Sequence, residues 1–183
     1  MKSLALLAGI ATLALPVSSA EAGIMTIGSG LARSCYEASE AREATRSNIE
    51  TCNRALIEQA LDRHDQVATY VNRGILHYLS NNLVEANSDY DRAIALDPNE
   101  PEAWLNKAMA ALIAGDNRTA APLFDKALAL KTSRPALAYY GRAMVNEDQG
   151  NVRQAYADLK RARELEPGWA LPAQELKRYV VRN

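Results

Sequence analysis

Two cysteines, Cys35 and Cys52, are the residues of this chain whose type and spacing suggest chemistry. The polar stretch Thr45-Arg46-Ser47 lies between them, and we expect it to turn one helix back on another so that the two thiols face each other. A disulfide there would close a loop of roughly 17 residues and stabilise the fold by about 3 kcal/mol. Two free buried cysteines are the alternative. A redox-active pair is a third reading, disfavoured because nothing like Cys-x-x-Cys is present.

Catalytic and metal-binding patterns are missing from the rest of the sequence. The two histidines, His64 in a charged stretch and His77 in a helix, do not have paired metal-ligand spacing. There is no Gly-rich phosphate loop and no Gly-x-Ser-x-Gly turn, and the carboxylates fall on exposed helix faces. Lys plus Arg number 21 against 22 Asp plus Glu, so no excess positive charge favours nucleic acid. We therefore predict a protein that is not an enzyme and that needs no metal and no cofactor.

A five-residue block occurs four times in the sequence, and its alanines are 38, 34 and 35 residues apart. This repeat predicts the elements that position the residues above. That period is typical of a helical solenoid. The copies are Cys52-Asn53-Arg54-Ala55-Leu56, Tyr90-Asp91-Arg92-Ala93-Ile94, Phe124-Asp125-Lys126-Ala127-Leu128 and Leu159-Lys160-Arg161-Ala162-Arg163.

Small and large residues around the block follow helical spacing. In the last three copies a small residue stands seven positions before the alanine and a large one three positions before it, which predicts one buried helix stripe. Asn81, Gly115 and Gly150 lie twelve residues before the alanines and tolerate the left-handed backbone that ends a helix. Each unit is therefore predicted to be a helix, a tight turn and a second helix.

This pattern resembles the tetratricopeptide repeat, a 34-residue helix-turn-helix unit. The resemblance implies an all-α solenoid, wound as a right-handed superhelix, with three repeats, a degenerate hairpin before them and a capping helix after them. The second unit departs from the family, because Thr132 stands where proline is expected and one extra residue precedes the third unit. The expected ranges are 31–66 for the degenerate hairpin, 67–100, 101–134 and 136–169 for the repeats, and 170–183 for the capping helix.

By the same resemblance, the first helices of the repeats line a concave groove that binds a protein or peptide partner. Asn72 and Asn106 occupy a position from which amides in some family members hold a peptide backbone. The basic residues that clamp a C-terminal carboxylate in chaperone-binding relatives are absent, so a chaperone-tail receptor is disfavoured. The groove residues expected here are Val71, Asn72, Ile75, Tyr78, Leu105, Asn106, Met109, Leu112, Ile113, Tyr140 and Met144.

Two other functions stay open. The groove could be covered by the chain's own N-terminal segment or by a second copy, in a self-associating structural or assembly factor, although we expect a monomer. An unrecognised hydrolase is the second alternative, and no residue suggests it.

The N-terminus predicts export. Lys2, the apolar run from Leu4 to Leu15 and the Ala20-Glu21-Ala22 pattern are typical of a cleaved signal peptide, residues 1–22, with Gly23 as the new N-terminus. An uncleaved anchor or a hydrophobic first helix is the alternative. A Gly-rich leader, 23–30, would follow. We expect a periplasmic protein that has no membrane contact after cleavage and can form a disulfide.

Overall fold

The computed structural model describes residues 30–179, which fold into helices only. The expected signal peptide, nearly all of the expected leader and residues 180–183 lie outside the described residues. The helices are α1 Leu31–Glu40, α2 Arg46–Glu58, α3 Arg63–Leu79, α4 Leu83–Leu96, α5 Pro101–Ile113, α6 Asn117–Ala129, α7 Pro135–Asp148, α8 Val152–Leu165 and α9 Ala170–Leu176.

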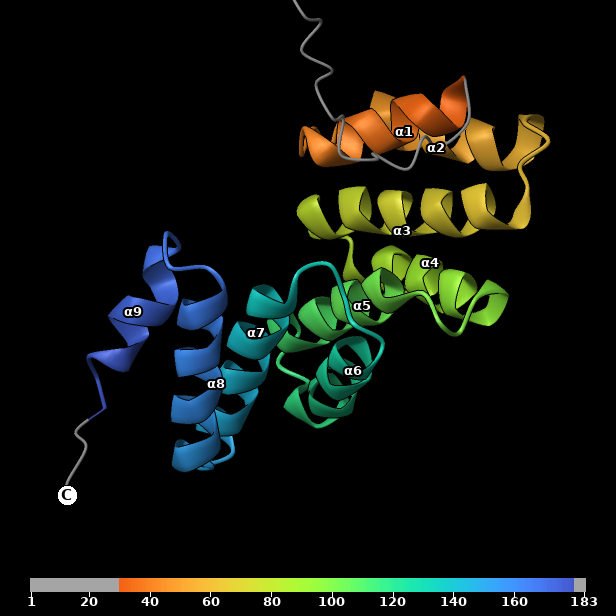
Figure 1. Ribbon diagram of the computed structural model, residues 1–183. Coiled ribbons are helices and arrows are strands. Elements are labelled where there is room, and N and C mark those ends of the chain that lie inside the picture. Colours follow the sequence, from red (N-terminus) through yellow and green to blue (C-terminus); the bar gives the residue numbers. More distant parts are fainter. Residues whose placement is uncertain (1–29, 180–183) are drawn as a thin grey trace, which may run out of the picture.

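These helices pack in chain order as antiparallel pairs, with α1 against α2, α3 against α4, α5 against α6 and α7 against α8. The first helix of each pair also packs on the first helix of the next, and the direction of the helices changes along the stack from α3 to α8 (Figure 1). The expected all-α, pairwise architecture is confirmed. Within the described part, none of the helices is both long and apolar enough to cross a membrane.

The turns inside the repeats are made by the three residues expected there. Asn81, Gly115 and Gly150 have φ values of 61°, 77° and 77°. After α5, the amide of Gly115 donates to the carbonyl of Leu112 and the amide of Asp116 donates to that of Ala111, a pairing that satisfies the last carbonyls of a helix. The same left-handed ending recurs at Arg42 and Lys131, where the sequence did not suggest it.

The second helices carry the buried stripe that the repeat spacing predicted. Tyr90, Phe124 and Leu159 are almost completely buried, as are the alanines before and after them: Ala86, Ala93, Ala120, Ala127, Ala155 and Ala162. The aromatic rings press on glycines of neighbouring first helices. A Cβ at Gly74 would lie 2.5 Å from the Tyr90 ring, and one at Gly141 would lie 2.3 Å from Phe124. The small residues therefore set how closely the helices approach.

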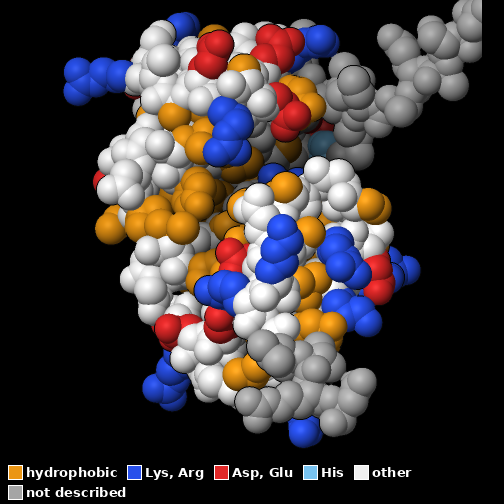
Figure 2. All heavy atoms as spheres, turned by 90° about the vertical axis from the view of Figure 1, so that its left-hand side faces the viewer, with side chains coloured by type: hydrophobic (Ala, Val, Ile, Leu, Met, Phe, Trp, Pro, Cys, Tyr) orange, Lys and Arg blue, Asp and Glu red, His pale blue; other side chains and the backbone are white. Residues whose placement is uncertain are grey.

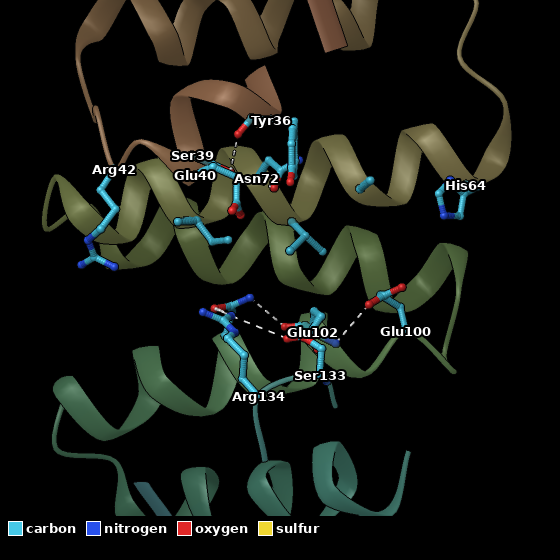
Figure 3. Close-up of a pocket in the computed structure, with 14 residues that line it drawn as sticks. Tyr36, Ser39, Glu40, Arg42, His64, Asn72, Glu100, Glu102, Ser133 and Arg134 are labelled. Atoms are coloured by element: carbon cyan, nitrogen blue, oxygen red, sulfur yellow. Dashed lines mark hydrogen bonds and ion pairs between the residues drawn. The ribbon is translucent and has the colours of Figure 1, made fainter. Parts of the chain in front are cut away.

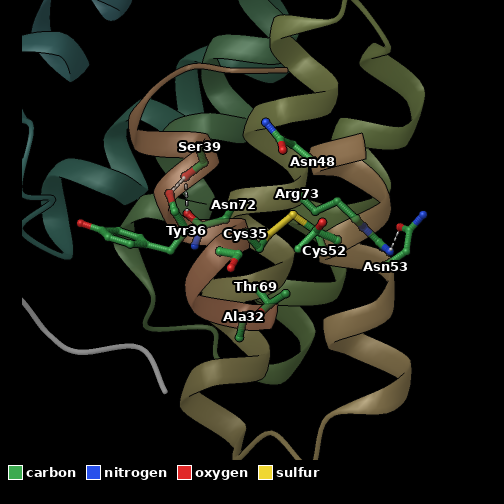
Figure 4. The surroundings of a disulfide bond; sticks show 12 residues. Ala32, Cys35, Tyr36, Ser39, Asn48, Cys52, Asn53, Thr69, Asn72 and Arg73 are labelled. Carbon is green, nitrogen blue, oxygen red and sulfur yellow. Dashed lines mark hydrogen bonds between the residues drawn. A yellow bond between two sulfur atoms is a disulfide. The ribbon is translucent and has the colours of Figure 1, made fainter. Parts of the chain in front are cut away.

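The N-terminal hairpin, α1 and α2, is joined by the disulfide between Cys35 and Cys52 (Figure 4). The pairing is confirmed, but the expected place of the turn was wrong. The chain reverses over residues 41–45, before the predicted stretch, because Arg42 takes the left-handed conformation and Thr45 already caps α2 by accepting from the amide of Asn48. This earlier turn lies midway between the two cysteines, which places them opposite each other.

The C-terminal helix is shorter than expected. α9 ends at Leu176 and is followed by turns to Tyr179, so the described residues 177–179 of the expected capping helix are not helical. It packs on α8. Pro172 is buried there, and the Trp169 ring before the helix lies 4.8 Å from that of Tyr140.

Candidate binding groove

A pocket of about 720 Å³ opens on the first helices of consecutive pairs. α1, α3 and the start of α5 form most of it, and the loop before α7 closes one side (Figure 3). Four of the residues expected in the groove, Val71, Asn72, Ile75 and Asn106, line it together. The other lining residues are Tyr36, Ser39, Glu40, Arg42, His64, Ala68, Glu100, Glu102, Ser133 and Arg134.

Asn72 presents its amide at the centre of this pocket. Only 7% of the residue is exposed, and its Oδ1 accepts a hydrogen bond of 3.0 Å from the Ser39 hydroxyl on α1. That bond fixes the side-chain orientation, and among the described residues the Nδ2 group has no hydrogen-bond acceptor. The Nδ2 group is not fully enclosed, so it can donate into the pocket. A peptide carbonyl entering the pocket would satisfy it.

Asn106 is held by its own surroundings instead. Its Nδ2 donates to the Glu102 carbonyl at 2.9 Å, and its Oδ1 accepts from Nη2 of Arg134 at 3.1 Å. The Oε1 atom of Glu102 in turn accepts from the Thr132 hydroxyl at 2.8 Å and from the Ser133 amide at 2.7 Å. Asn106 therefore secures the loop that borders the pocket.

The two ends of the pocket differ in charge. Glu100, which caps α5 by accepting from the Glu102 amide, has its pKa raised, first by burial and then by the neighbouring carboxylates of Glu102 and Asp97. Oε2 of Glu102 is buried and has no hydrogen-bond donor, with the Arg134 guanidinium 3.6 Å away. The exposed Arg42 lies near the opposite end (Figure 3) and acts on Tyr78, whose pKa is nevertheless raised by burial.

The other expected groove residues do not line this pocket. Leu105 is fully buried, so it belongs to the core between α5, α6 and α7 and offers no surface to a partner. Met109 and Leu112 pack against that core while partly exposed.

Tyr78, Tyr140 and Met144 are also partly exposed, and Tyr78 packs against Ala86 and Tyr90. Ile113 at the end of α5 is 58% exposed. From the left-hand side of Figure 1, hydrophobic side chains gather in a hollow at mid-height of the molecule (Figure 2).

The sequence did not point to several pocket residues. Tyr36 and Ser39 come from the first helix of the degenerate hairpin, for which no groove positions were assigned, and Glu100 is the last residue of the first repeat. Ser133 and Arg134 belong to the loop that contains the extra residue of the second unit. The extra residue was the one feature of the sequence that indicated a surface loop here, because an insertion between packed helices has to lie on the surface.

A small acidic group lies at the start of α3. Ligand atoms of Asp62, His64 and Asp65 are within 4.8 Å of one another. Asp62 caps α3 by accepting from the Asp65 amide at 2.8 Å, and Asp62 and His64 are exposed. The cluster thus has a structural role as a helix cap, and we assign it no ion.

Comparisons with known proteins support the repeat fold. Among solved structures, the chain is similar to the first tetratricopeptide repeat domain of RPAP3 bound to the HSP90 peptide SRMEEVD, at 24% identity and a TM-score of 0.59 over 64% of this chain and 91% of that one. It is similar to MamA at 18% identity and a TM-score of 0.64, over 78% and 80% of the two chains. For the Arabidopsis OM64 repeat domain the values are 21% and 0.59, over 65% and 100%.

These likenesses show the fold alone, since all are below 25% identity. No curated protein matches the chain. The tetratricopeptide repeat family model matches residues 71–135 and 105–168, which together make up more than half of the sequence. This chain belongs to the tetratricopeptide repeat family.

Proposed function

We propose that this protein captures an extended segment of a partner protein in the pocket on α1, α3 and α5. Domains of this family are typically protein-protein interaction modules. The observation that carries the proposal is the nearly buried Asn72 amide, held by Ser39 with its Nδ2 left to donate into a 720 Å³ pocket. Such a donor, in a concave site beside apolar side chains, suits a peptide carbonyl.

Binding energy would come mainly from apolar contact. Ala68, Val71 and Ile75 lie on one face of α3, spaced three and four residues apart, and border the pocket. Burying apolar surface is worth about 25 cal/mol per Å² before the cost of ordering the segment is subtracted. Asn72 would then fix the register of the segment.

A C-terminal carboxylate is not the feature that we propose is recognised. At four positions where chaperone-binding relatives carry clamp residues, this chain has Val71, Ile75, Leu137 and Gly141. No cation stands at those positions to hold a terminal carboxylate. We therefore propose that the bound segment is internal to the partner's chain and is not a chaperone's C-terminal tail.

Site-specific photo-crosslinking tests the proposal. A photoreactive residue at position 75, in the pocket, should crosslink to a partner in cells, whereas one at position 57, where Ile57 is 82% exposed on α2, should not. Asn72→Ala should weaken binding of the crosslinked segment, made as a peptide, without changing the free energy of unfolding by more than about 1 kcal/mol. Crosslinks from position 75 only to residues 23–29 or to a second copy would contradict partner capture and support the self-covered alternative.

We also propose that the protein works in an oxidising compartment after export. The disulfide between Cys35 and Cys52 supports this, since such bonds persist outside the reducing cytosol. Mass spectrometry of protein purified without reductant should find no alkylatable thiol and a chain that begins at Gly23. Two free thiols or an intact residue 1 would contradict the proposal.

A further inference from the structure

The start of α5 places negative charge at one end of the pocket. Glu100 and Glu102 both line it, and Asp97 lies close enough to act on Glu100. One guanidinium, from Arg134, faces this end, and it is shared between Glu102 and Asn106. His64 is the basic group that acts on Glu100. Carboxylate charge thus exceeds the positive charge arranged around it.

The carboxylates are also incompletely satisfied. The Oε2 atom of Glu102 is buried without a hydrogen-bond donor, although Oε1 has two. Glu100 is partly buried and accepts a hydrogen bond from the Glu102 amide. Partly desolvated carboxylates without full pairing gain most from a cation that enters the same low-dielectric space.

The pocket also has the right neighbours for a long basic side chain. Ala68 and Val71 lie between the acidic end and Asn72 along the pocket face of α3. The methylene groups of lysine or arginine can cover such apolar surface while the charged head reaches an acid. From His64 to Ile75, α3 rises about 16 Å, which is the length of roughly five residues of extended chain.

We infer, on the basis of the proposed function, that the bound segment carries a lysine or arginine whose head group pairs with Glu100 and Glu102, while its neighbouring apolar residues cover Val71 and Ile75. The partner is therefore an extended, basic and apolar segment. Arg42, at the other end of the pocket, disfavours a second cation there and leaves room for an acidic or neutral residue.

A displayed library of random eight-residue peptides tests this inference. The full disulfide-bonded chain is used as bait, and the variant Ile75→Arg, which places a cation in the pocket at a partly exposed position, serves as the blocked control. Clones enriched on the wild type over the blocked control should contain lysine plus arginine at least three times as often as aspartate plus glutamate. Enrichment without a charge preference, or a preference for acids, would overturn the inference while leaving the proposed function standing.

No enrichment over the blocked control would instead overturn the proposed function itself. Selected peptides are then synthesised and titrated against two matched variants. Glu100→Gln can keep the cap of α5 but removes the charge, and should raise Kd at least fivefold. Glu166→Gln makes the same change at an exposed carboxylate after α8, outside the pocket, and should leave Kd within twofold. Equal effects of the two substitutions would contradict pairing at Glu100.

Discussion

Gly141 shows how a single atom sets the distance between two helices. It lies in the middle of α7, where alanine would normally stabilise a helix by about 0.5–1 kcal/mol. Here a Cβ would lie 2.3 Å from Cζ of the fully buried Phe124 ring. We predict that Gly141→Ala lowers the free energy of unfolding by about 1–3 kcal/mol, because the packed ring has to move.

Urea denaturation followed by circular dichroism measures this effect. Gly168→Ala is the matched control, since no atom lies within 4 Å of its Cβ position, and it should change the stability by less than about 0.5 kcal/mol. Adding Phe124→Leu to Gly141→Ala should recover part of the loss. A stabilising Gly141→Ala would contradict the close approach.

His77 makes the stability of the fold depend on pH. Burial lowers its pKa, with Arg73 acting in the same direction and Asp89 and Glu85 opposing it. Its Nδ1 is buried without a hydrogen-bond partner among the described residues. The folded state therefore binds a proton less readily than the unfolded state, whose histidine titrates near pH 6.5.

The expected consequence is a stability that is fully present above about pH 6.5 and falls as the pH is lowered towards 5. His77→Phe keeps a ring but removes the titrating group, so its free energy of unfolding should fall less over the same interval. Urea denaturation at pH 7.5, 6.5 and 5.5 measures both slopes. Parallel slopes for wild type and His77→Phe would refute the role of His77.

Consecutive helix pairs are joined by a polar ladder. Arg73 on α3 donates to Asn53 on α2 at 2.8 Å, Lys107 on α5 pairs with Asp91 on α4, and Arg142 on α7 donates to Asp125 on α6 at 2.6 Å (Figure 4 shows the first). Each acceptor occupies the second position of the recurring block. The last block has Lys160 there, and in the part of the chain that the structure describes the single helix α9 follows α8. The charge reversal thus coincides with the last described helix pair.

Arg142 also holds its own pair together. It donates to both oxygens of Asp158 on α8, at 2.9 and 2.7 Å, and the Asp158 side chain is 8% exposed. We predict that Asp158→Ala costs about 2 kcal/mol, because it leaves a partly buried guanidinium without its main partner. Asp125→Ala removes a partner that is 63% exposed and should cost less than about 0.5 kcal/mol. Chemical denaturation of both variants measures the difference, and equal costs would contradict this assignment.

Sequence periodicity predicts the elements where local signals and packing agree. The second helices and their turns follow from the alanine spacing and from Asn81, Gly115 and Gly150, since helix period and backbone permissiveness are local properties. The turn of the first hairpin was misplaced because Arg42 adopts a left-handed conformation without a glycine. α9 was predicted too long because amphipathic spacing alone does not set where a helix ends.

At the scale of the whole molecule, the sequence predicted that the first helices line a groove, but it did not predict which of their residues are exposed in it. Leu105 and Val71 occupy the same position of their repeats, yet Leu105 is fully buried and Val71 lines the pocket. The difference depends on how closely the next pair stacks and on the loop that Glu102 holds. Such contacts join residues about 30 positions apart, and no local pattern encodes them.

The helix pairs contact mainly their neighbours in the chain. A destabilising substitution in one pair should therefore lower the stability of that pair and the adjacent one more than that of distant pairs. The disulfide closes 17 residues of chain at one end, and Cys35 and Cys52 are fully buried against Leu76 on α3. We predict that Cys35→Ser/Cys52→Ser destabilises the N-terminal hairpin by about 3 kcal/mol. In a solenoid, where each unit is stabilised by its nearest neighbours, this loss should spread to α3 and fade beyond it.

Hydrogen exchange followed by mass spectrometry measures this spread. Amides of α1, α2 and α3 should exchange faster in the double variant, because their opening free energy is lower, while those of α7, α8 and α9 should keep the wild-type rate. Gly141→Ala, at the other end of the array, is the control. It should speed amide exchange at the C-terminal end and leave the exchange rates of α1 and α2 unchanged. Uniform acceleration in both variants would instead mean that the array unfolds as one cooperative unit, in which case the disulfide would stabilise the groove and the far end equally.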